Sequence, residues 1–368
     1  MEKLNGSDMD KNTLKRYDKS SGNPVIIAGP CSAESPGQML EAANALKLGG
    51  NVDYFRAGLW KPRTSPESFQ GVGAGGLKWL REVRQETGMK VATEVGCEKH
   101  ALEALKYDID LLWIGARTVS NPFVVQEIAE ALRGVDIPVL VKNPLNPDLE
   151  LWYGAITRFL KLGIKEVGAI HRGFSLWGKS IYRNPAIWKI QRSLQERLPG
   201  ILMICDPSHI AGKRSLVPLV SRRAMEEGSN GLMIEVHPDP GNAMSDASQQ
   251  LNPSSFYDLI KDLDLDRSFS AAYEDPAIDE LTSEIDLVDE LLVHTIANRM
   301  ELSKQIARMK NSDRLRDLQP AKLEKALKRL LGLASEDGLR PDFVHRLFDE
   351  IQRESCHVQS SCTGIFNK

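Results

Sequence analysis

The sequence predicts a (β/α)8 TIM barrel followed by an all-α domain of three helices. Eight strand-length apolar runs recur through the first two-thirds of the chain, and most stretches between them are long enough for one helix. Beyond Pro276 the alternation stops, and apolar residues recur at helical spacing. The eight runs are Pro24–Cys31, Tyr54–Gly58, Lys90–Val95, Leu111–Ala116, Pro138–Lys142, Glu166–Arg172, Leu202–His209 and Gly231–His237.

Length and composition support two folded domains. The chain has 368 residues, of which 42% are hydrophobic, enough for more than one domain with a real core. We expect a polar, disordered tail over residues 1–22 and a barrel over 23–265, close to the ~250 residues usual for this fold. A linker rich in charged and small residues is expected over 266–276, and the helical domain over 277–368.

The helical domain is predicted to contain three helices, over residues 277–309, 320–331 and 340–361. The first has no Gly or Pro and carries an apolar stripe. Three helices cannot bury their apolar faces alone, so we expect a homodimer through this domain, with a higher homo-oligomer left open. The stripe consists of Ile278, Leu281, Ile285, Val288, Leu292 and Ile296.

Charge and cysteine usage exclude several classes of protein. The formal net charge of −3 argues against nucleic-acid binding, which needs a basic patch. No apolar run approaches the ~20 residues that span a membrane. The five cysteines form no C-x-x-C pair, which argues against a disulfide framework and for a cytoplasmic protein.

Residues suited to metal binding lie at or just beyond the first, seventh and eighth runs: Cys31, His209, Glu235 and Asp246. Because the active site of a (β/α)8 barrel is built at the C-terminal ends of its strands, these residues are expected to converge. The mixed donor set would accept Mn, Fe, Co or Zn and leave a position open for substrate. A small buried Cys and a helix-capping Asp are the alternative interpretation.

Cations also follow the predicted strands. A charge at the end of an apolar strand is costly unless it meets a counter-ion, and Glu94 could neutralise only one of them. The excess predicts two phosphorylated or acidic substrates, with backbone N–H groups of Gly115 and Ala116 available to a phosphate; simple solvation is the alternative. The six cations are Arg56, Lys61, Arg63, Arg117, Lys142 and Arg172.

Five motifs, in order, resemble the β-type of class I 3-deoxy-D-arabino-heptulosonate-7-phosphate (DAHP) synthase. That family condenses phosphoenolpyruvate with erythrose 4-phosphate, the first step of the shikimate pathway to aromatic amino acids. A sister family, 3-deoxy-manno-octulosonate-8-phosphate synthase, shares the barrel and uses arabinose 5-phosphate; the run KPRT at residues 61–64 favours the erythrose 4-phosphate enzyme. The motifs are IAGPCSAE (27–34), KPRTSPESFQG (61–71), IGAR (114–117), DPSHIAGKR (206–214) and GLMIEVHPDPGNAMSDASQQL (231–251).

This resemblance implies a role for each barrel residue named above. A divalent metal, Mn first with Fe, Co or Zn as alternatives, is implied on Cys31, His209, Glu235 and Asp246. The chemistry of this reaction gives two further hypotheses: Lys142 supplies a proton to the aldehyde oxygen, and Glu94 assists the attack of water on the phosphoenolpyruvate carbon. The metal ligand His209 is the third catalytic candidate in the barrel. Phosphoenolpyruvate is implied to bind Arg56, Ala116, Arg117, Lys142 and Arg172, and erythrose 4-phosphate to bind Lys61, Arg63 and Thr64.

In the first predicted helix, Arg299 and Lys310 continue the apolar stripe. Either the stripe drifts to the surface there, or the helices line a pocket for a dianion. Residues 278–359 resemble the type II chorismate mutases, which convert chorismate to prephenate by conformational restraint and charge stabilisation. The resemblance rests on Arg299-x-x-x-Ser303, Lys310, Leu318-Gln319-Pro320 and Ser355-x-x-x-Gln359.

The second resemblance implies Arg299 and Lys322 on the chorismate carboxylates, Lys310 and Gln359 on the ether oxygen, and Ser355 in the same site. Thr282 stands where this family usually presents an arginine. Lys322 also replaces a commoner arginine, and lysine cannot form a bidentate fork. Three interpretations stay open: an active mutase, a weak or inactive mutase that senses chorismate or prephenate and regulates the barrel, and a module that only dimerises the chain.

Overall fold

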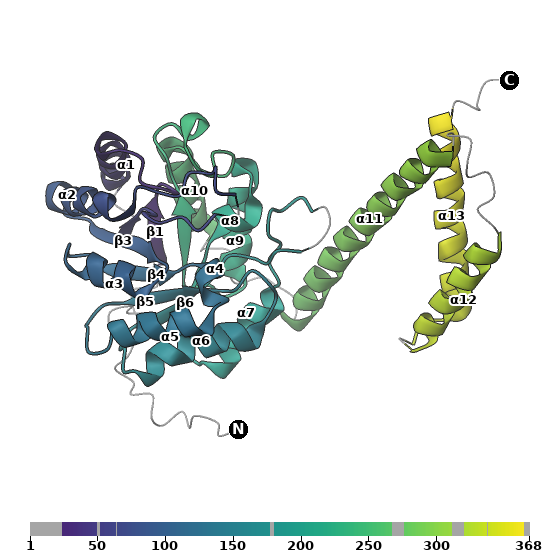
Figure 1. The fold of residues 1–368 in the computed structure, drawn as a ribbon, viewed down its shortest axis with the longest axis horizontal. Coiled ribbons are helices and arrows are strands. Elements are labelled where there is room, and N and C mark those ends of the chain that lie inside the picture. The colour runs from purple at the N-terminus through teal and green to yellow at the C-terminus, as the bar shows by residue number, and fades with distance from the viewer. Residues whose placement is uncertain are drawn as a thin grey trace. The chain divides into compact units, whose positions relative to one another are not determined.

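The structure of the protein is a computed structural model that describes residues 24–49, 52–63, 65–176, 180–266, 276–310, 320–336 and 338–363. It contains two compact units (Figure 1). We call residues 24–266 the barrel unit and residues 276–363 the helical unit. The predicted tail and most of the predicted linker lie outside the described residues.

The barrel unit contains a closed parallel sheet in the order β1 to β8, which confirms the predicted (β/α)8 barrel. Strands β1 and β8 close it, with Val25 opposite Gly231 and Gly29 opposite Glu235. Four strands end just before a polar site residue, and four carry one at or near their C-terminal end. The residues that follow a strand are Cys31, Arg117, Arg172 and Asp206, and those on a strand are Arg56, Glu94, Lys142 and Glu235. The strands are β1 (Val25–Gly29), β2 (Tyr54–Arg56), β3 (Lys90–Val95), β4 (Leu111–Ile114), β5 (Val139–Lys142), β6 (Val167–His171), β7 (Leu202–Cys205) and β8 (Gly231–Glu235).

Helices surround this sheet (Figure 1). Several begin where the sequence places a capping side chain before a proline, as at Ser35, Asn121 and Asp206. The helices are α1 (Pro36–Leu48), α2 (Leu77–Thr87), α3 (Glu98–Leu105), α4 (Ala116–Val119), α5 (Pro122–Ala131), α6 (Leu149–Lys161), α7 (Trp188–Arg197), α8 (Pro207–Ala211), α9 (Val217–Glu226) and α10 (Pro253–Asp266).

Apolar side chains fill two layers of the barrel unit. One layer lies between strands and helices and includes Phe55, Trp152 and Phe159. The other fills the barrel interior and includes Ile27, Trp113 and Met233. Because both faces of each strand are buried, the strands read in the sequence as continuous apolar runs rather than as alternating ones.

The helical unit contains α11 (Pro276–Lys310), α12 (Pro320–Glu336) and α13 (Pro341–Thr363). All three begin at a proline, whose fixed φ and missing N–H suit the first helical position. Each predicted helix is present, and the second extends to Glu336 rather than ending at residue 331. Among the described residues, no helix is both long and apolar enough to cross a membrane.

The apolar stripe of α11 is only partly covered within one chain. Ile285, Val288 and Leu292 are 58%, 59% and 46% exposed. Further along the helix, Met300 and Ser303 are buried, and Arg299 bonds to α13. At Arg299 and Ser303 the stripe is therefore covered, whereas Ile285, Val288 and Leu292 before them and Ile306 after them are exposed.

Candidate active site

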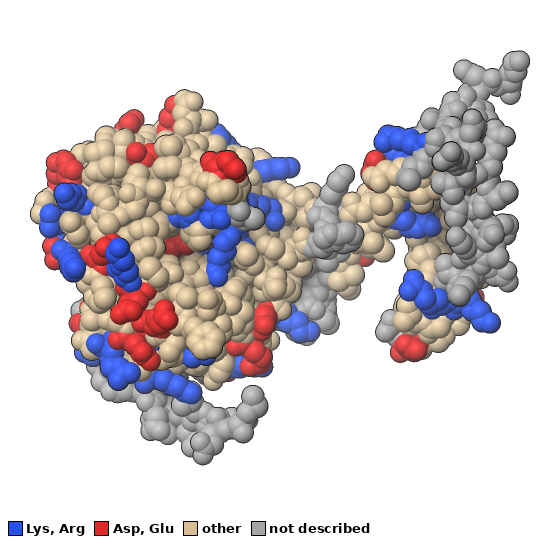
Figure 2. Space-filling model, in the orientation of Figure 1, with Lys and Arg blue, Asp and Glu red and all other residues tan. Residues whose placement is uncertain are grey.

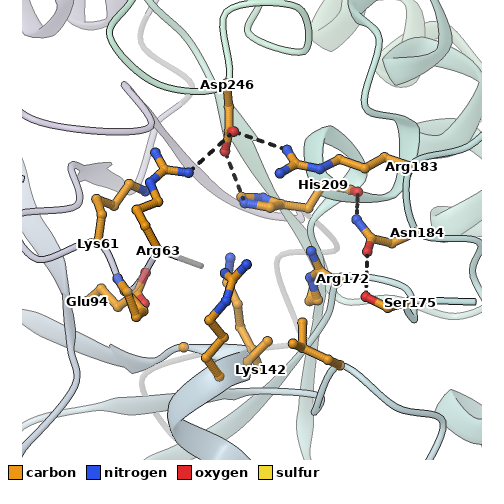
Figure 3. Close-up of a pocket in the computed structure, with 15 residues that line it drawn as sticks. Lys61, Arg63, Glu94, Lys142, Arg172, Ser175, Arg183, Asn184, His209 and Asp246 are labelled. Carbon is orange, nitrogen blue, oxygen red and sulfur yellow. Dashed lines mark hydrogen bonds and ion pairs between the residues drawn. The ribbon is translucent and has the colours of Figure 1, made fainter. Parts of the chain in front are cut away.

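A cavity of about 250 Å³ opens at the C-terminal end of the barrel strands. Lys and Arg side chains gather on the barrel face around α4 and α8 (Figure 2). Because the lining residues follow seven different strands, the barrel brings together side chains that are far apart in sequence (Figure 3). They are Lys61, Pro62, Arg63, Glu94, Gly115, Ala116, Arg117, Lys142, Leu145, Arg172, Ser175, Arg183, Asn184, His209 and Asp246.

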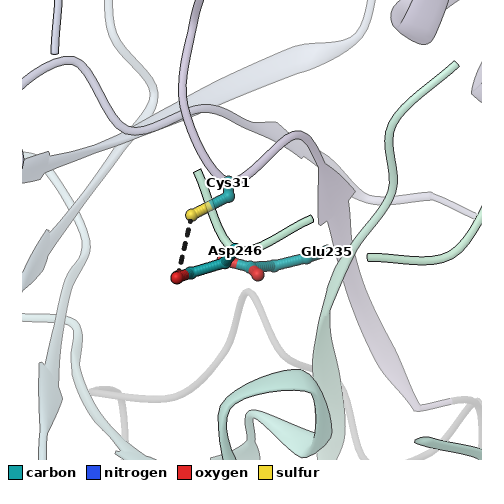
Figure 4. A group of neighbouring side chains, drawn as sticks. All are labelled: Cys31, Glu235 and Asp246. Atoms are coloured by element: carbon teal, nitrogen blue, oxygen red, sulfur yellow. Dashed lines mark hydrogen bonds between the residues drawn. The ribbon is translucent and has the colours of Figure 1, made fainter. Parts of the chain in front are cut away.

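Three of the four predicted metal ligands form a cluster beside this cavity. Ligand atoms of Cys31, Glu235 and Asp246 all lie within 4.8 Å of one another (Figure 4). The Cys31 Sγ donates to Asp246 Oδ2 at 3.3 Å. The fourth residue, His209, lies at the edge of the cluster, with Nε2 3.8 Å from Asp246 Oδ2 and Nδ1 3.8 Å from Glu235 Oε1.

Asp206 contacts the imidazole of His209 at Nδ1. Its Oδ2 lies 2.8 Å from His209 Nδ1, the arrangement by which a carboxylate fixes the ring of a metal-ligating histidine. Burial alone would raise the pKa of Asp206, but His209 and Lys142 outweigh burial and hold it well below its ordinary value. Asp206 is therefore an anion that anchors two neighbouring site residues.

The cluster fits a divalent cation. Glu235 is fully buried, yet its Oε1 accepts no hydrogen bond from the described residues. Burial and the carboxylates of Glu235 and Asp246 raise the pKa of the Cys31 thiol to about 12. A cation would supply the partner that Oε1 lacks and the positive charge that a thiolate needs. Sulfur, nitrogen and oxygen donors together suit a first-row transition metal.

The cavity also fits anions. Arg172 is almost fully buried, and burial lowers its pKa to about 10, with Arg117 and Arg183 nearby. Lys142 Nζ donates to Asp206 Oδ2 at 2.6 Å. Lys142 is therefore paired with a carboxylate, because Asp206 reaches it from the end of β7.

Arg56 is the one predicted phosphoenolpyruvate contact, among the described residues, that does not line the cavity. Its Nη2 donates to the Cys31 carbonyl at 3.2 Å and lies 3.5 Å from Glu235 Oε1. Its guanidinium lies 4.9 Å from the Trp113 ring centroid. The Nε and Nη1 groups are buried and have no partner among the described residues, so two donors remain for an anion beside the metal cluster.

Glycines let the strand ends approach one another. A Cβ on Gly115 would lie 2.1 Å from Glu94 Oε1, and one on Gly58 would lie 2.8 Å from the Cys31 carbonyl oxygen. For Lys61, burial lowers the pKa, but Cys31 and Glu94 outweigh burial and raise it. Thr64, the third predicted erythrose 4-phosphate contact, lies outside the described residues.

Three residues of the cavity wall were not predicted from the sequence: Ser175, Arg183 and Asn184. They belong to the long connection between β6 and α7. The Asn184 side chain donates to the His209 carbonyl at 2.7 Å, which holds this connection against α8. Only the presence of Arg and Asn after a predicted strand could have indicated these residues.

In the helical unit, Arg299 on α11 meets Ser355 on α13. Its Nη1 donates to the Ser355 hydroxyl and to the Ile351 carbonyl at 3.3 Å, and its Nη2 donates to Gln352 Oε1 at 3.0 Å. All three acceptors are neutral. Gln359 is half-buried one turn further along α13. The side chains of Thr282, Lys310 and Lys322 lie outside the described residues.

Fold and site together define a barrel enzyme in which cations face a cavity beside a metal-type donor set. The model of the DAHP synthetase I family matches residues 12–268, and the chain belongs to that family. The model of type II chorismate mutase matches residues 281–360. The chain thus combines a DAHP synthase domain, a transferase, with a chorismate mutase domain, an isomerase; both classes belong to the shikimate pathway.

Individual relatives agree with the barrel assignment. A phospho-2-dehydro-3-deoxyheptonate aldolase from Thermotoga maritima is 34% identical over 243 residues, covering 66% of this chain and 70% of the relative. A solved structure of that aldolase has a TM-score of 0.61 at 32% identity and covers 67% of this chain and 71% of that one. A 2-dehydro-3-deoxyphosphooctonate aldolase from Vesicomyosocius okutanii is 30% identical and covers 65% of this chain and 88% of the relative.

Proposed function

We propose that the barrel unit catalyses a metal-dependent condensation of phosphoenolpyruvate with erythrose 4-phosphate, giving DAHP and inorganic phosphate. One observation carries the proposal: the cavity that holds the buried cations Lys142 and Arg172 is also lined by His209 and Asp246, and Asp246 belongs to the cluster with Cys31 and Glu235 beside it. Two anionic substrates require several cations, and an aldehyde that accepts a carbon nucleophile benefits from a Lewis acid.

Cys31, His209, Glu235 and Asp246 would hold the divalent metal. We propose Mn²⁺, with Fe, Co or Zn as alternatives of the same ligand preference. When bound, the ion supplies polarisation of the substrate aldehyde. The thiol proton of Cys31, held at high pKa by burial, must leave as the metal binds, so affinity is expected to rise with pH.

The cations divide between the two substrates. Arg117, Arg172, Lys142 and the Ala116 backbone would bind phosphoenolpyruvate, with the two free donors of Arg56 available to its carboxylate. Lys61, Arg63 and Thr64 would bind erythrose 4-phosphate. Guanidinium forks suit phosphate and carboxylate because two parallel N–H groups meet two oxygens.

The proton transfers are assigned to Lys142 and Glu94. As the enol carbon attacks the aldehyde carbon, Lys142 Nζ gives its proton to the aldehyde oxygen, and Asp206 holds the amine in place. Water then adds to C2 of the phosphoenolpyruvate part and loses a proton toward Glu94. The C2–O bond to phosphate then breaks, and the C2 hydroxyl passes its proton to the departing phosphate as the ketone forms, with Arg117 and Arg172 stabilising the phosphate charge.

The direct test is phosphate release from phosphoenolpyruvate on addition of erythrose 4-phosphate. The octulosonate aldolase is the second candidate, because that branch also aligns with the barrel. Turnover with erythrose 4-phosphate but not arabinose 5-phosphate is expected, since Lys61, Pro62 and Arg63 all line the cavity. The reverse preference would overturn the proposal.

We further propose that the helical unit converts chorismate to prephenate. The carrying observation is Arg299, a half-buried cation whose acceptors among the described residues are all neutral, which suits a carboxylate ligand. Lys322 would bind the other carboxylate, and Lys310 and Gln359 the ether oxygen, with Ser355 beside Arg299. Chorismate consumption with prephenate as product tests this.

An inactive sensor is the competing proposal for the helical unit. It is favoured by Thr282, which offers no guanidinium at a position where this family usually has one. Absence of chorismate turnover, together with slower synthase turnover when chorismate or prephenate is added, would support the sensor. Turnover of chorismate would exclude it.

We propose a homodimer formed through the helical unit. The exposed apolar residues Ile285, Val288, Leu292 and Val293 lie along α11, and a second copy would remove them from water. Light scattering should give twice the monomer mass. We also propose a cytoplasmic location and a division into domains at residues 23–265 and 277–368.

A further inference from the structure

Two adjacent glutamines, Gln249 and Gln250, lie fully buried beside the metal cluster. They follow Asp246 in the connection after β8. Burying an amide is costly unless its donor and its acceptor are both used. Both side chains satisfy this requirement with groups that belong to the cluster or contact it.

Gln249 holds Glu235. Its Nε2 donates to Glu235 Oε2 at 2.8 Å, and its Oε1 accepts from Arg183 Nη1 at 2.7 Å. The amide has one possible orientation, since arginine offers only donors and an ionised carboxylate only acceptors. With Oε2 fixed in this way, Oε1 is the Glu235 oxygen without a hydrogen-bond partner among the described residues.

Arg183 extends the same network to Asp246. Its Nη1 lies 3.1 Å from Asp246 Oδ1 (Figure 3). The same Nη1 donates to Gln249 Oε1. The Arg183 backbone N–H donates to the Ala211 carbonyl at 3.3 Å. A Cβ on Gly212 would lie 2.3 Å from Arg183 Cβ, so the arginine stem packs closely against the end of α8.

Gln250 holds the backbone of Cys31. Its Oε1 accepts from the Cys31 backbone N–H at 3.0 Å, and its Nε2 donates to the Ser245 carbonyl at 2.8 Å. Asp246 itself has a φ of +50°, a left-handed conformation that costs energy for a non-glycine residue. The Gln249 N–H donates to the Asp246 carbonyl at 3.1 Å and stabilises that turn.

We propose that Gln249 and Gln250 are positioning residues of the metal site: Gln249 orients the Glu235 and Asp246 carboxylates, the latter through Arg183, and Gln250 places Cys31. This inference rests on the metal site proposed above. Groups that orient metal ligands typically change metal affinity about 10- to 100-fold when they are removed. Neither glutamine contacts substrate in this assignment.

Co²⁺ binding to the full chain separates positioning from general stability. Co²⁺ is titrated into metal-free protein in competition with a chelator, and the cobalt–thiolate absorption band reports bonding to Cys31. Gln249→Leu and Gln250→Leu are compared with Gln191→Leu, which removes another fully buried glutamine, bonded to His171 and to Glu227 and Ser229.

We expect Gln249→Leu and Gln250→Leu to raise the Co²⁺ dissociation constant about 10-fold or more. Gln191→Leu should lower the melting temperature and leave the dissociation constant unchanged. Should the buried variants not fold, Arg183→Met serves instead, because Arg183 is partly exposed; it is expected to weaken Co²⁺ binding as well.

The outcomes are distinct. Co²⁺ affinities of Gln249→Leu and Gln250→Leu equal to that of Gln191→Leu would overturn the inference, as would an unchanged affinity in Arg183→Met. If the unmodified chain gave no cobalt–thiolate band, the metal site itself would be overturned, and the inference with it. Weaker Co²⁺ binding together with an altered cobalt–thiolate band in Gln249→Leu and Gln250→Leu supports both the metal site and the positioning role of the two glutamines.

Discussion

The two sites of this chain are built by opposite means. In the barrel unit, charged groups from many strand ends are held by one another: Lys142 and His209 share Asp206, and Arg183 bridges Asp246 and Gln249. In the helical unit, one cation, Arg299, is held by neutral acceptors of a single helix, α13. The first arrangement suits a metal and two anions. The second suits one anionic ligand whose conformation is restrained.

The barrel unit and the helical unit also differ in how much of their apolar surface and their sites one chain encloses. The barrel closes on itself, and residues that follow seven of its strands line one cavity. The helical unit leaves Ile285, Val288 and Leu292 of α11 exposed. The comparison therefore predicts that synthase chemistry depends on the metal cluster, whereas mutase chemistry depends on Arg299 and on association of the helical unit.

The largest expected effect is loss of the metal. Cys31→Ala should abolish synthase turnover, because the ion supplies several kcal/mol of charge stabilisation in the transition state. Chorismate consumption by the same variant should be unchanged. Both rates are measured on one preparation, and Cys205→Ala, which replaces a buried cysteine outside the cluster, is the matched control. Unimpaired synthase turnover in Cys31→Ala would remove the thiol from the site.

A smaller loss is expected for Lys142→Met. Removing a general acid typically costs about 10²- to 10⁴-fold in rate, and methionine keeps the unbranched stem of the side chain while removing the amine and its proton. Steady-state phosphate release measures the effect, and retained binding of phosphoenolpyruvate shows that the cavity is intact. An unchanged kcat would exclude Lys142 as the proton donor.

In the helical unit the corresponding substitution is Arg299→Ala. We expect it to slow chorismate conversion about 10²- to 10³-fold, because removing one group that stabilises transition-state charge typically costs that much. Synthase turnover should remain. Arg346→Ala, a change at an exposed arginine of α13, provides the control. Loss of both activities in Arg299→Ala, with the fold intact, would contradict separate sites.

The smallest expected effect is a pH dependence of the stability of the barrel unit. Burial lowers the pKa of His171 on β6 to about 4 from an ordinary 6.5. The His171 imidazole binds a proton more readily in the unfolded chain than in the folded one. The contribution of neutral, buried His171 to the free energy of unfolding is therefore present above about pH 6.5 and is lost as the pH falls toward 4. The shift corresponds to about 3 kcal/mol at most.

Urea unfolding between pH 7 and 4.5 measures this dependence. His171→Asn should lower the free energy of unfolding at pH 7 and flatten its fall with decreasing pH, because the variant has no imidazole to charge. A variant with the same pH slope as the unmodified chain would show that His171 is not the group responsible.

Much of this molecule could be predicted from the sequence. The barrel follows from apolar runs that are buried on both faces, and the convergence of Lys61, Glu94, Arg117 and Lys142 follows from the rule that strand ends meet. The helical unit follows from spacing and from prolines at the start of each helix. These are local signals, and the fold class follows from their order.

What could not be predicted depends on contacts between distant segments. Asp206 reaches Lys142 across 64 positions of sequence, and Gln249 reaches Arg183 across 66. No local pattern marks such partners, because a buried glutamine and a surface glutamine look alike in sequence. For α11 the spacing predicted an apolar face that three helices could not bury, but it did not indicate which residues of that face are exposed, as Ile285, Val288 and Leu292 are.

The central claim is that one chain carries a metal-dependent synthase site and a separate, metal-independent mutase site. The most direct measurement follows both reactions on one preparation stripped of metal and then supplied with Mn²⁺. The account predicts phosphate release only after Mn²⁺ is added, with chorismate consumption the same before and after. Full phosphate release from the stripped protein, or chorismate consumption that depends on Mn²⁺, would contradict it.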